Sequence, residues 1–315
     1  YASQDGLCCV DTLHRVTITG LEKNTTYFYR VLSQEVKELL PYRPVLGNIV
    51  STDIWEKPLT FTTLDGRQET LSIVMINDIH GKNDLQKKLL EMAPPQNVDM
   101  VVFCGDMCNY INKQSDIFTG FLDTSVGLFA SRKPFVYVRG NHETRGAYAR
   151  NFFRYLAGPE GKFYYAFTYG PIRFIVLDSG EDKPDTDVEY SGLVDFDNYI
   201  LEQKEWLARE LESPEFRAAS FRVVLSHIPF GKGSWYGSER LRKQLLPLLE
   251  SVRIDLMLSG HNHAFGFMDK GKVTAFPIIV NSNNSVLTMF GSKDLLKVQV
   301  KQIDGKVLLE KEFSK

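Results

Sequence analysis

Residues 258–263 read Leu258-Ser259-Gly260-His261-Asn262-His263 and follow a short apolar run that begins at Ile254. The run predicts a buried strand, so the two histidines stand in the loop directly after it. Side chains two residues apart in an extended backbone point to the same side, and both imidazoles can therefore reach one small volume. Such a pair is more often solvated than metal-bound. A metal site can therefore be predicted only if other parts of the chain supply further ligands.

Four more apolar runs end in the same kind of polar loop. Residues 73–76 precede Asn77-Asp78-Ile79-His80, residues 100–104 precede Gly105-Asp106-Met107-Cys108-Asn109, residues 135–138 come shortly before Gly140-Asn141-His142-Glu143, and residues 221–225 precede Ser226-His227. In an α/β sheet, side chains at the carboxyl ends of the strands meet in one crevice, where ligands usually bind. We therefore expect the five loops to form a single site.

The histidines are concentrated in these loops. Of the six histidines only His14 lies elsewhere, and the other five are His80, His142, His227, His261 and His263. Together with Asp78, Asp106 and Asn141 they indicate a metal site, whereas any one of them alone would be a hydrogen-bonded structural histidine. Nitrogen and oxygen ligands without thiolates suit Mn, Fe, Zn or Co. The number of ligands predicts two ions, with one carboxylate touching both.

Length and composition indicate a globular protein with one large domain and a smaller part. The chain has 315 residues, of which 43% are hydrophobic and 24% charged, and these are ordinary values for a protein with a sizeable core. A net charge of -2 makes a nucleic-acid partner unexpected. No apolar run reaches the ~20 residues of a membrane span. The four cysteines form no disulfide framework and leave the redox compartment open.

The first sixty-odd residues have a different pattern. Val16 and Ile18 alternate with polar residues, and the alternation returns between Tyr27 and Val31 after a polar turn. Residues 59–63 form a third candidate strand, after a loop-like segment that contains Pro and Gly. These features predict a few half-buried strands in place of the α/β pattern that follows.

This N-terminal pattern resembles the latter half of a fibronectin type III module, in which Tyr27 would be the corner tyrosine. The resemblance covers about three strands, so either the module is reduced or the sequence begins partway through it. We expect residues 1–66 to form this partial, β-sandwich-like module and residues 67–315 to form the domain that carries the histidines. A packing role for the module is favoured over direct contact with a substrate.

The five loops resemble the motifs of the calcineurin-like metallophosphoesterases, in the same order: Asp-x-His, Gly-Asp-x-x-Asn, Gly-Asn-His-Glu, a histidine after a strand, and Gly-His-x-His. The resemblance covers about residues 70–315. It implies an α/β fold in which two stacked mixed β-sheets are flanked by helices. It also implies a division of the ligands between two metals.

In that division, Asp78, His80 and His263 hold one ion, and Asp106 bridges the two. The second ion takes Asn141, His227 and His261. His142 stays free of metal and faces the substrate.

Within this family, the fibronectin-like module and the segments 163–167 and 174–178 are most similar to the purple acid phosphatase branch. That branch has Gly where this chain has His80, and Tyr where this chain has Asn109. The tyrosine is the ferric ligand that gives the purple colour. We therefore expect a generic pair of divalent or mixed-valence ions, Mn, Fe or Zn, in place of a stable ferric charge-transfer site. The same resemblance suggests an extracytoplasmic protein, periplasmic, secreted or surface-anchored, whose signal segment is absent from a sequence that begins at Tyr1.

The resemblance implies a phosphohydrolase. A hydroxide that bridges the two metals would attack phosphorus in line, and His142 would protonate or hydrogen-bond the departing oxygen. Small phosphomonoesters are the expected substrates, and a phosphodiesterase or nucleotidase is the alternative. A non-catalytic binding module at the cell surface is a third interpretation, against which the complete ligand set argues.

Further residues are candidates for substrate contact or for support of the site. Arg145 could clamp a phosphate oxygen. Asn109 and Tyr236 could also contact the substrate, Tyr236 from a Gly-rich loop that includes Trp235. Glu143 is expected to orient an imidazole.

The remaining segments complete the expected domain. Helical spacing of apolar residues predicts helices that cover a sheet at 85–92, 201–211 and 241–249. Apolar runs predict strands of a second sheet at 274–280, 286–289, 296–300 and 307–313. The acidic segment 181–198 is expected to be a solvated loop, with a substrate-shaping lid as the alternative.

Overall fold

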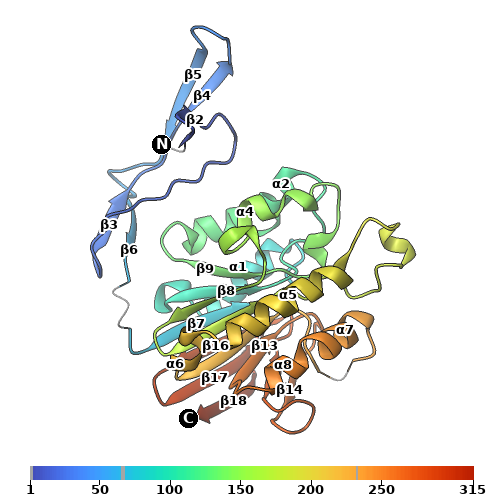
Figure 1. Ribbon diagram of the computed structural model, residues 1–315. Coiled ribbons are helices and arrows are strands. Elements are labelled where there is room, and N and C mark those ends of the chain that lie inside the picture. The colour runs from blue at the N-terminus through green and yellow to red at the C-terminus, as the bar shows by residue number, and fades with distance from the viewer. Residues whose placement is uncertain (1–2, 65–67, 232) are drawn as a thin grey trace. The chain divides into compact units, whose positions relative to one another are not determined.

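The computed structural model describes residues 3–64, 68–231 and 233–315 of the chain (Figure 1). Two compact units, Tyr1–Arg67 and Gln68–Lys315, account for the contacts within it. The boundary expected between residues 66 and 67 lies outside the described residues.

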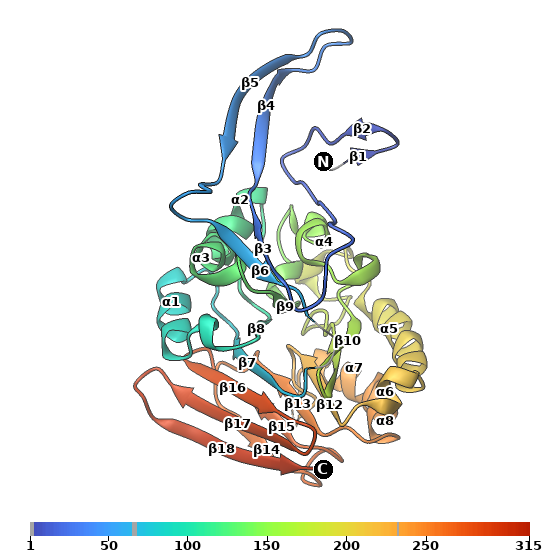
Figure 2. The ribbon, with the colours of Figure 1, turned by 90° about the vertical axis from the view of Figure 1, so that its left-hand side faces the viewer.

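Residues 3–64 of the N-terminal unit form three two-stranded antiparallel pairs. They are β1 (Ser3–Gln4) with β2 (Leu7–Cys8), β3 (Thr26–Tyr29) with β6 (Leu59–Thr62), and β4 (Leu32–Glu38) with β5 (Val45–Ser51). Figure 2 shows β4 and β5 as a long hairpin. The strands expected near Tyr27 and at 59–63 are therefore present, and they pair with each other.

Two expectations for this unit are wrong. Val16 and Ile18 form no strand and are 59% and 57% exposed, so their alternation marks no buried face. The segment before residue 59 holds the β4–β5 hairpin where a loop was expected. Most side chains of that hairpin are exposed, so its sequence lacks the alternation of apolar and polar residues that predicts a strand.

Tyr27 links β3 to the segment before it and to β6. Its hydroxyl accepts a hydrogen bond of 2.8 Å from the backbone amide of Glu22. Its ring stacks on Phe61 across the β3–β6 pair, with 5.8 Å between centroids. None of the residues whose burial is described, 3 and 5–64, is fully buried, so this unit has little core of its own.

The second unit contains two six-stranded mixed sheets. The first has the order β18-β17-β16-β7-β8-β9, and the second has the order β10-β11-β12-β13-β15-β14. The strands of the first sheet are β7 (Leu71–Ile76), β8 (Met100–Cys104), β9 (Phe135–Val138), β16 (Ser285–Gly291), β17 (Leu295–Gln302) and β18 (Val307–Ser314). Those of the second are β10 (Tyr165–Tyr169), β11 (Ile172–Leu177), β12 (Phe221–Ser226), β13 (Leu256–Ser259), β14 (Gly266–Met268) and β15 (Ile278–Val280).

Helices connect the strands and cover the sheets. They are α1 (Asn83–Met92), α2 (Gln114–Ile117), α3 (Asp123–Ser125), α4 (Phe153–Leu156), α5 (Phe196–Leu211), α6 (Pro214–Ala218), α7 (Tyr236–Gln244) and α8 (Leu246–Glu250). Two π-helical segments, η2 (Phe118–Leu122) and η3 (Val126–Ala130), make one helical stretch with α2 and α3. The short 3-10 turns are η1 (Pro95–Asn97), η4 (His142–Thr144), η5 (Ala149–Asn151), η6 (Pro159–Gly161) and η7 (Val188–Tyr190).

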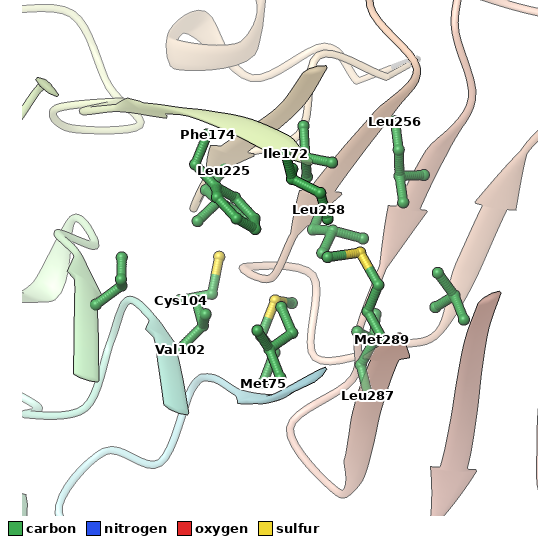
Figure 3. Close-up of a cluster of buried hydrophobic side chains, with 14 of the residues drawn as sticks. Met75, Val102, Cys104, Ile172, Phe174, Leu225, Leu256, Leu258, Leu287 and Met289 are labelled. Atoms are coloured by element: carbon green, nitrogen blue, oxygen red, sulfur yellow. The ribbon is translucent and has the colours of Figure 1, made fainter. Parts of the chain in front are cut away.

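The main core lies between the two sheets. Figure 3 shows Met75 and Cys104 of the first sheet facing Phe174 and Leu225 of the second, all of them fully buried. Alternate residues of the same strands, such as Val74, point to the outer faces, which pack against helices. Because both faces are covered, these strands appear in the sequence as continuous apolar runs.

The helices divide between the two outer faces. Figure 2 shows α1 and α3 on one side of the paired sheets and α5, α6 and α8 on the other. Two separate apolar clusters lie under these layers. The expected fold, two stacked mixed sheets flanked by helices, is confirmed. No helix among the described residues is long and apolar enough to cross a membrane.

Four expectations for this unit need correction. The five strands that precede the polar loops do not share one sheet, because β7, β8 and β9 belong to the first and β12 and β13 to the second. For the same reason the strands expected to build a second sheet at 286–289, 296–300 and 307–313, which are β16, β17 and β18, instead continue the first sheet beside β7. The helix expected over 241–249 is two helices, α7 and α8, that meet at Leu245, with Pro247 in the first turn of α8. The acidic segment 181–198 is not generally solvated, since Glu181 and Asp182 are buried.

Candidate metal centre

The loops after five strands bring the predicted ligands together from both sheets. Asp78 and His80 follow β7, Asp106 follows β8, and Asn141 follows β9. His227 comes directly after β12 in the second sheet, and His261 and His263 follow β13. Backbone hydrogen bonds tie neighbouring loops, for example from the amide of Asp78 to the carbonyl oxygen of Gly105 at 2.9 Å. The site therefore lies where the carboxyl ends of strands from both sheets meet.

Five of these residues have a left-handed backbone. They are Asp78 (φ 55°), His80 (φ 50°), Asp106 (φ 55°), His261 (φ 72°) and His263 (φ 54°). Such values are uncommon for residues other than glycine and cost free energy, and they cluster at functional sites. The tight loops also leave no room for a side chain at Gly105 or Gly140, where an added Cβ would collide with His227 or Asp106.

The first cluster of possible ligands is Asp78, His80 and His263. Nε2 of His263 lies 3.2 Å from Oδ1 of Asp78 and 3.0 Å from Nε2 of His80. Their ligand atoms all lie within 4.8 Å of one another, which is close enough to share one ion. This is the set that the family resemblance assigned to one metal.

The second cluster is Asp106, His227 and His261, whose ligand atoms meet the same distance limit. Nε2 of His227 lies 3.2 Å from Oδ2 of Asp106. Asp106 also belongs to a third cluster with His80 and His142. Its Oδ2 lies 4.0 Å from Nε2 of His80 and 3.9 Å from Nε2 of His142. Asp106 is thus the carboxylate that lies between the two groups of ligands.

The residues present fit metal ions on a second ground. Oδ1 of Asn141 is buried and has no hydrogen-bond partner among the described residues, and buried Oδ1 of Asp78 and Nε2 of His227 have only other candidate ligands, His263 and Asp106, at 3.2 Å. An unpaired buried polar atom is costly, and a carboxylate more so. A cation in contact with these atoms removes that cost, and its ligands would be the oxygen and nitrogen donors that divalent transition metals accept.

The charges of the site are strongly coupled. Burial works to raise the pKa of Asp106, but the neighbouring His227 and His142 outweigh it and hold that pKa well below its usual range. Burial works to lower the pKa of His227, and Asp106 and Asp78 outweigh it and raise the pKa to about 10. Without a cation, a proton on His227 therefore neutralises part of the carboxylate charge.

The other ligand histidines behave differently. Burial lowers the pKa of His80 and of His261 to about 4, so both imidazoles are neutral at pH 7. Hydrogen bonding to Asp78 raises the pKa of His263. Neutral imidazoles are the form that binds metal.

Glu143 supports the loops instead of an imidazole. It is fully buried, and its carboxylate accepts backbone N–H groups of Asp106, Cys108 and Gly140, each at 2.9 Å. The expectation that it orients a histidine is therefore wrong. What it fixes is the backbone on either side of Asp106.

His142 faces the cluster from the loop after β9. Its Nδ1 lies 2.8 Å from the carbonyl oxygen of Asn109, and because a carbonyl has no proton, Nδ1–H is the donor. Nη1 of Arg145 lies 3.1 Å from its Nε2. The Asn109 side chain is exposed, so the part of this residue that serves the site is its carbonyl group.

The two remaining candidates for substrate contact already have partners. Arg145 forms an ion pair with Glu181, at 2.9 Å. The hydroxyl of Tyr236 donates to Asp197 at 2.8 Å. Its neighbour Trp235 is the aromatic residue that touches the ligands, with its ring 5.8 Å from that of His261 and the residue 55% exposed. Sequence reasoning missed Glu181, because nothing in the acidic segment marks a buried carboxylate.

Comparisons with known proteins agree with this geometry. A family model described as Calcineurin-like phosphoesterase matches residues 71–265. Purple acid phosphatase 22 of Arabidopsis thaliana is 24% identical over 273 residues, which is 80% of this chain and 53% of that protein. The chain spans about half the length of the curated relatives that it matches.

Two solved structures have the same fold. A purple acid phosphatase from yellow lupin (Lupinus luteus) seeds gives a TM-score of 0.68 at 16% identity, over 94% of this chain and 61% of that chain. A dimetal phosphatase from Danio rerio gives a TM-score of 0.58 at 16% identity, over 78% of this chain and 98% of that one. At such low identity the likeness shows the fold alone.

The family match extends over more than half of the chain and contains every residue of the two ligand clusters, from Asp78 to His263. The clusters fit a dimetal site of the kind typical of that family. This chain therefore belongs to the calcineurin-like phosphoesterase family, with purple acid phosphatases among its distant relatives.

Proposed function

We propose that the protein is a metal-dependent phosphoester hydrolase that acts on small phosphomonoesters. The observation that carries this proposal is the convergence of seven nitrogen and oxygen ligands from two sheets on one site. They are Asp78, His80, Asp106, Asn141, His227, His261 and His263. A surface that only binds a partner would not need so many metal-ligating side chains in one place.

We propose that Asp78, His80 and His263 hold one ion and that Asp106 bridges to a second. Asn141, His227 and His261 complete the second site. Mn, Fe or Zn suits this mixture of imidazole, carboxylate and amide ligands. Such a pair of ions, when bound, makes water acidic enough to act as a nucleophile and neutralises the charge of the phosphate.

The protein's own groups then position the ester and supply a proton. The carbonyl of Asn109 holds Nδ1–H of His142, so Nε2 faces the site. When Nε2 carries a proton, it can give that proton to the oxygen that leaves phosphorus, and the departing alcohol is released neutral. We assign His142 and Asp106 as the catalytic residues.

Arg145 brings the charged N–H donor Nη1 next to His142, while its Nε and Nη2 pair with Glu181. A phosphomonoester dianion gains more from such a donor than a diester monoanion, which favours the monoester. Asn109 and Tyr236 are proposed to contact the rest of the substrate, Asn109 because its exposed side chain lies next to the carbonyl that holds His142.

A substrate and metal panel tests the proposal. The purified protein, loaded in turn with Mn, Fe, Zn or Co, is incubated with phosphomonoesters, phosphodiesters and nucleotides. The expected result is metal-dependent turnover with the highest kcat/KM for monoesters. Turnover of diesters alone would replace the monoesterase assignment, and no turnover with any metal would overturn the proposed function.

For the N-terminal unit we propose a partial fibronectin type III-like module, supported by the paired strands β3 and β6 and by the bond from Glu22 to Tyr27. We also propose an extracytoplasmic location, supported by the relationship to purple acid phosphatases. Fractionation of cells that express the full natural protein tests this location, and a signal confined to the cytoplasm would contradict it.

A further inference from the structure

A buried carboxylate outside the ligand clusters is joined to the site through Arg145. Glu181 is 1% exposed, and both of its oxygens bind the guanidinium of Arg145, with Nε to Oε1 and Nη2 to Oε2 each at 2.9 Å. Two parallel N–H···O bonds of this kind fix the plane and the position of the guanidinium. Arg145 itself remains 28% exposed.

Glu181 is held just as firmly. Thr144 donates to its Oε1 at 2.6 Å, and the hydroxyl of Tyr190 donates to its Oε2 at 3.0 Å. Nη2 of Arg240 donates to its backbone carbonyl oxygen at 2.8 Å. Burial works to raise the pKa of Glu181, but the hydrogen bonds from Arg145 and Thr144 outweigh it and lower that pKa, so the carboxylate is ionised at neutral pH.

The fixed orientation leaves one end of the guanidinium toward the site. Nε and Nη2 donate to Glu181, and Nη2 also pairs with Asp182 at 3.5 Å. One Nη1–H donates to Nε2 of His142 at 3.1 Å, because Nδ1 carries the ring proton. His142 in turn lies 3.9 Å from Oδ2 of Asp106. A phosphate group that sits beside His142 therefore comes within reach of the Nη1 hydrogens.

From these contacts we propose that Glu181 is a positioning residue, which holds Arg145 as an anion-binding group beside His142 and so makes the site selective for phosphate dianions. This inference rests on the proposed phosphoester hydrolase. Because Glu181 balances the charge of the guanidinium, the site offers phosphate a directed Nη1–H donor, and the terminal oxygens of a dianionic monoester accept such a bond more strongly than those of a monoanionic diester. Without Glu181 the guanidinium would keep only the ion pair of its Nη2 with Asp182 at 3.5 Å, which does not fix its plane, and much of that selectivity would be lost.

Two variants separate this role from the chemistry. Glu181→Gln keeps the shape of the side chain and removes its charge. Arg145→Lys keeps the positive charge and removes the planar set of N–H donors that binds both oxygens of Glu181. Inorganic phosphate is titrated by calorimetry into each metal-loaded protein, and KM and kcat are measured for an aryl phosphate monoester and the matching diester. We expect both variants to bind phosphate about 10- to 100-fold more weakly, with a similar rise in KM for the monoester and little change for the diester.

Glu189→Gln is the matched control. Glu189 belongs to the same acidic segment but is exposed, and it pairs with Lys183 at the surface. We expect wild-type phosphate affinity for this variant. A double variant, Glu181→Gln with Arg145→Lys, should bind phosphate no more weakly than Arg145→Lys alone, because Glu181 acts only through Arg145.

Wild-type phosphate affinity in Glu181→Gln, or additive losses in the double variant, would overturn the inference. The phosphate titration does not depend on turnover. If the wild type hydrolyses no ester, the proposed function fails, and the titration alone still decides whether Glu181 positions Arg145. A thermal unfolding scan of each variant shows that the protein is folded during the titration.

Discussion

Nδ1 of His227 lies 2.7 Å from the carbonyl oxygen of Cys104, although the two residues follow or end strands of different sheets. The carbonyl can only accept, so Nδ1–H donates and Nε2 is the nitrogen that faces Asp106. A hydrogen bond to the second nitrogen is how proteins set the orientation of a metal-binding histidine. This hydrogen bond thus links the two sheets and orients the metal ligand His227.

Replacing His227 should therefore remove metal. In His227→Ala we expect loss of at least one ion per chain, with affinity falling by more than the about 10- to 100-fold that loss of an outer partner costs. Elemental analysis after dialysis against the metal measures this. His14→Ala is the control, since His14 is exposed and lies in the N-terminal unit. Full metal content in His227→Ala would remove His227 from the ligands.

Metal binding should release a proton. The pKa of His227 is raised to about 10 by Asp106 and Asp78 despite burial, so at neutral pH the metal-free imidazole is charged and a cation has to displace its proton. The affinity for metal therefore falls as the pH falls, by about tenfold per pH unit for one displaced proton, and it levels off above the pKa of His227. Calorimetry in two buffers with different ionisation enthalpies counts the protons, and a count of zero would contradict this account.

Glu143→Gln should destabilise the protein. The carboxylate accepts three buried amide groups, and an amide NH₂ in its place would face one of those donors. We expect a loss of about 2 to 3 kcal/mol in the free energy of unfolding. Urea unfolding of the metal-free protein measures it, in slightly alkaline buffer because burial and Asp106 raise the pKa of Glu143 to about 7. Exposed Glu189→Gln should change it by less than about 0.5 kcal/mol, and an equal effect of both would argue against the role of Glu143.

Trp235→Ala should change substrate preference and not stability. The half-exposed indole lies beside His261, where the leaving group of an aryl phosphate can pack on it. We expect KM for an aryl phosphate to rise roughly 2- to 10-fold, with little effect on an alkyl phosphate. Trp55→Ala, at an 87% exposed position in the other unit, is the control. Equal KM changes for both substrates would show that Trp235 does not contact the leaving group.

The site could be predicted from sequence because its ligands follow apolar runs. Each of Asp78, Asp106 and His227 stands within two residues of a buried strand. A polar ligand that directly follows an apolar run can be recognised from the sequence alone. The division of those strands between two sheets left no such signal, because strands covered on both faces look alike in either sheet.

Glu181 and Trp235 show where prediction from sequence ends. The bond between Glu181 and Arg145 joins residues 36 positions apart, and it exists only because both segments fold against the same strand ends. An acidic segment rich in turns looks solvated until its partner is known. Likewise, the neighbours Trp235 and Tyr236 are equivalent in sequence, and only the start of α7 decides that Tyr236 turns to Asp197.

The most direct test of the central claim is Asp106→Asn, because Asp106 lies between both ligand groups. Bound metal per chain and turnover of an aryl phosphate are measured for the wild type and the variant. The account predicts about two metals and metal-dependent hydrolysis in the wild type, with turnover reduced by orders of magnitude in the variant, as also for His142→Ala. Near-normal hydrolysis by a folded, metal-loaded Asp106→Asn protein would contradict it.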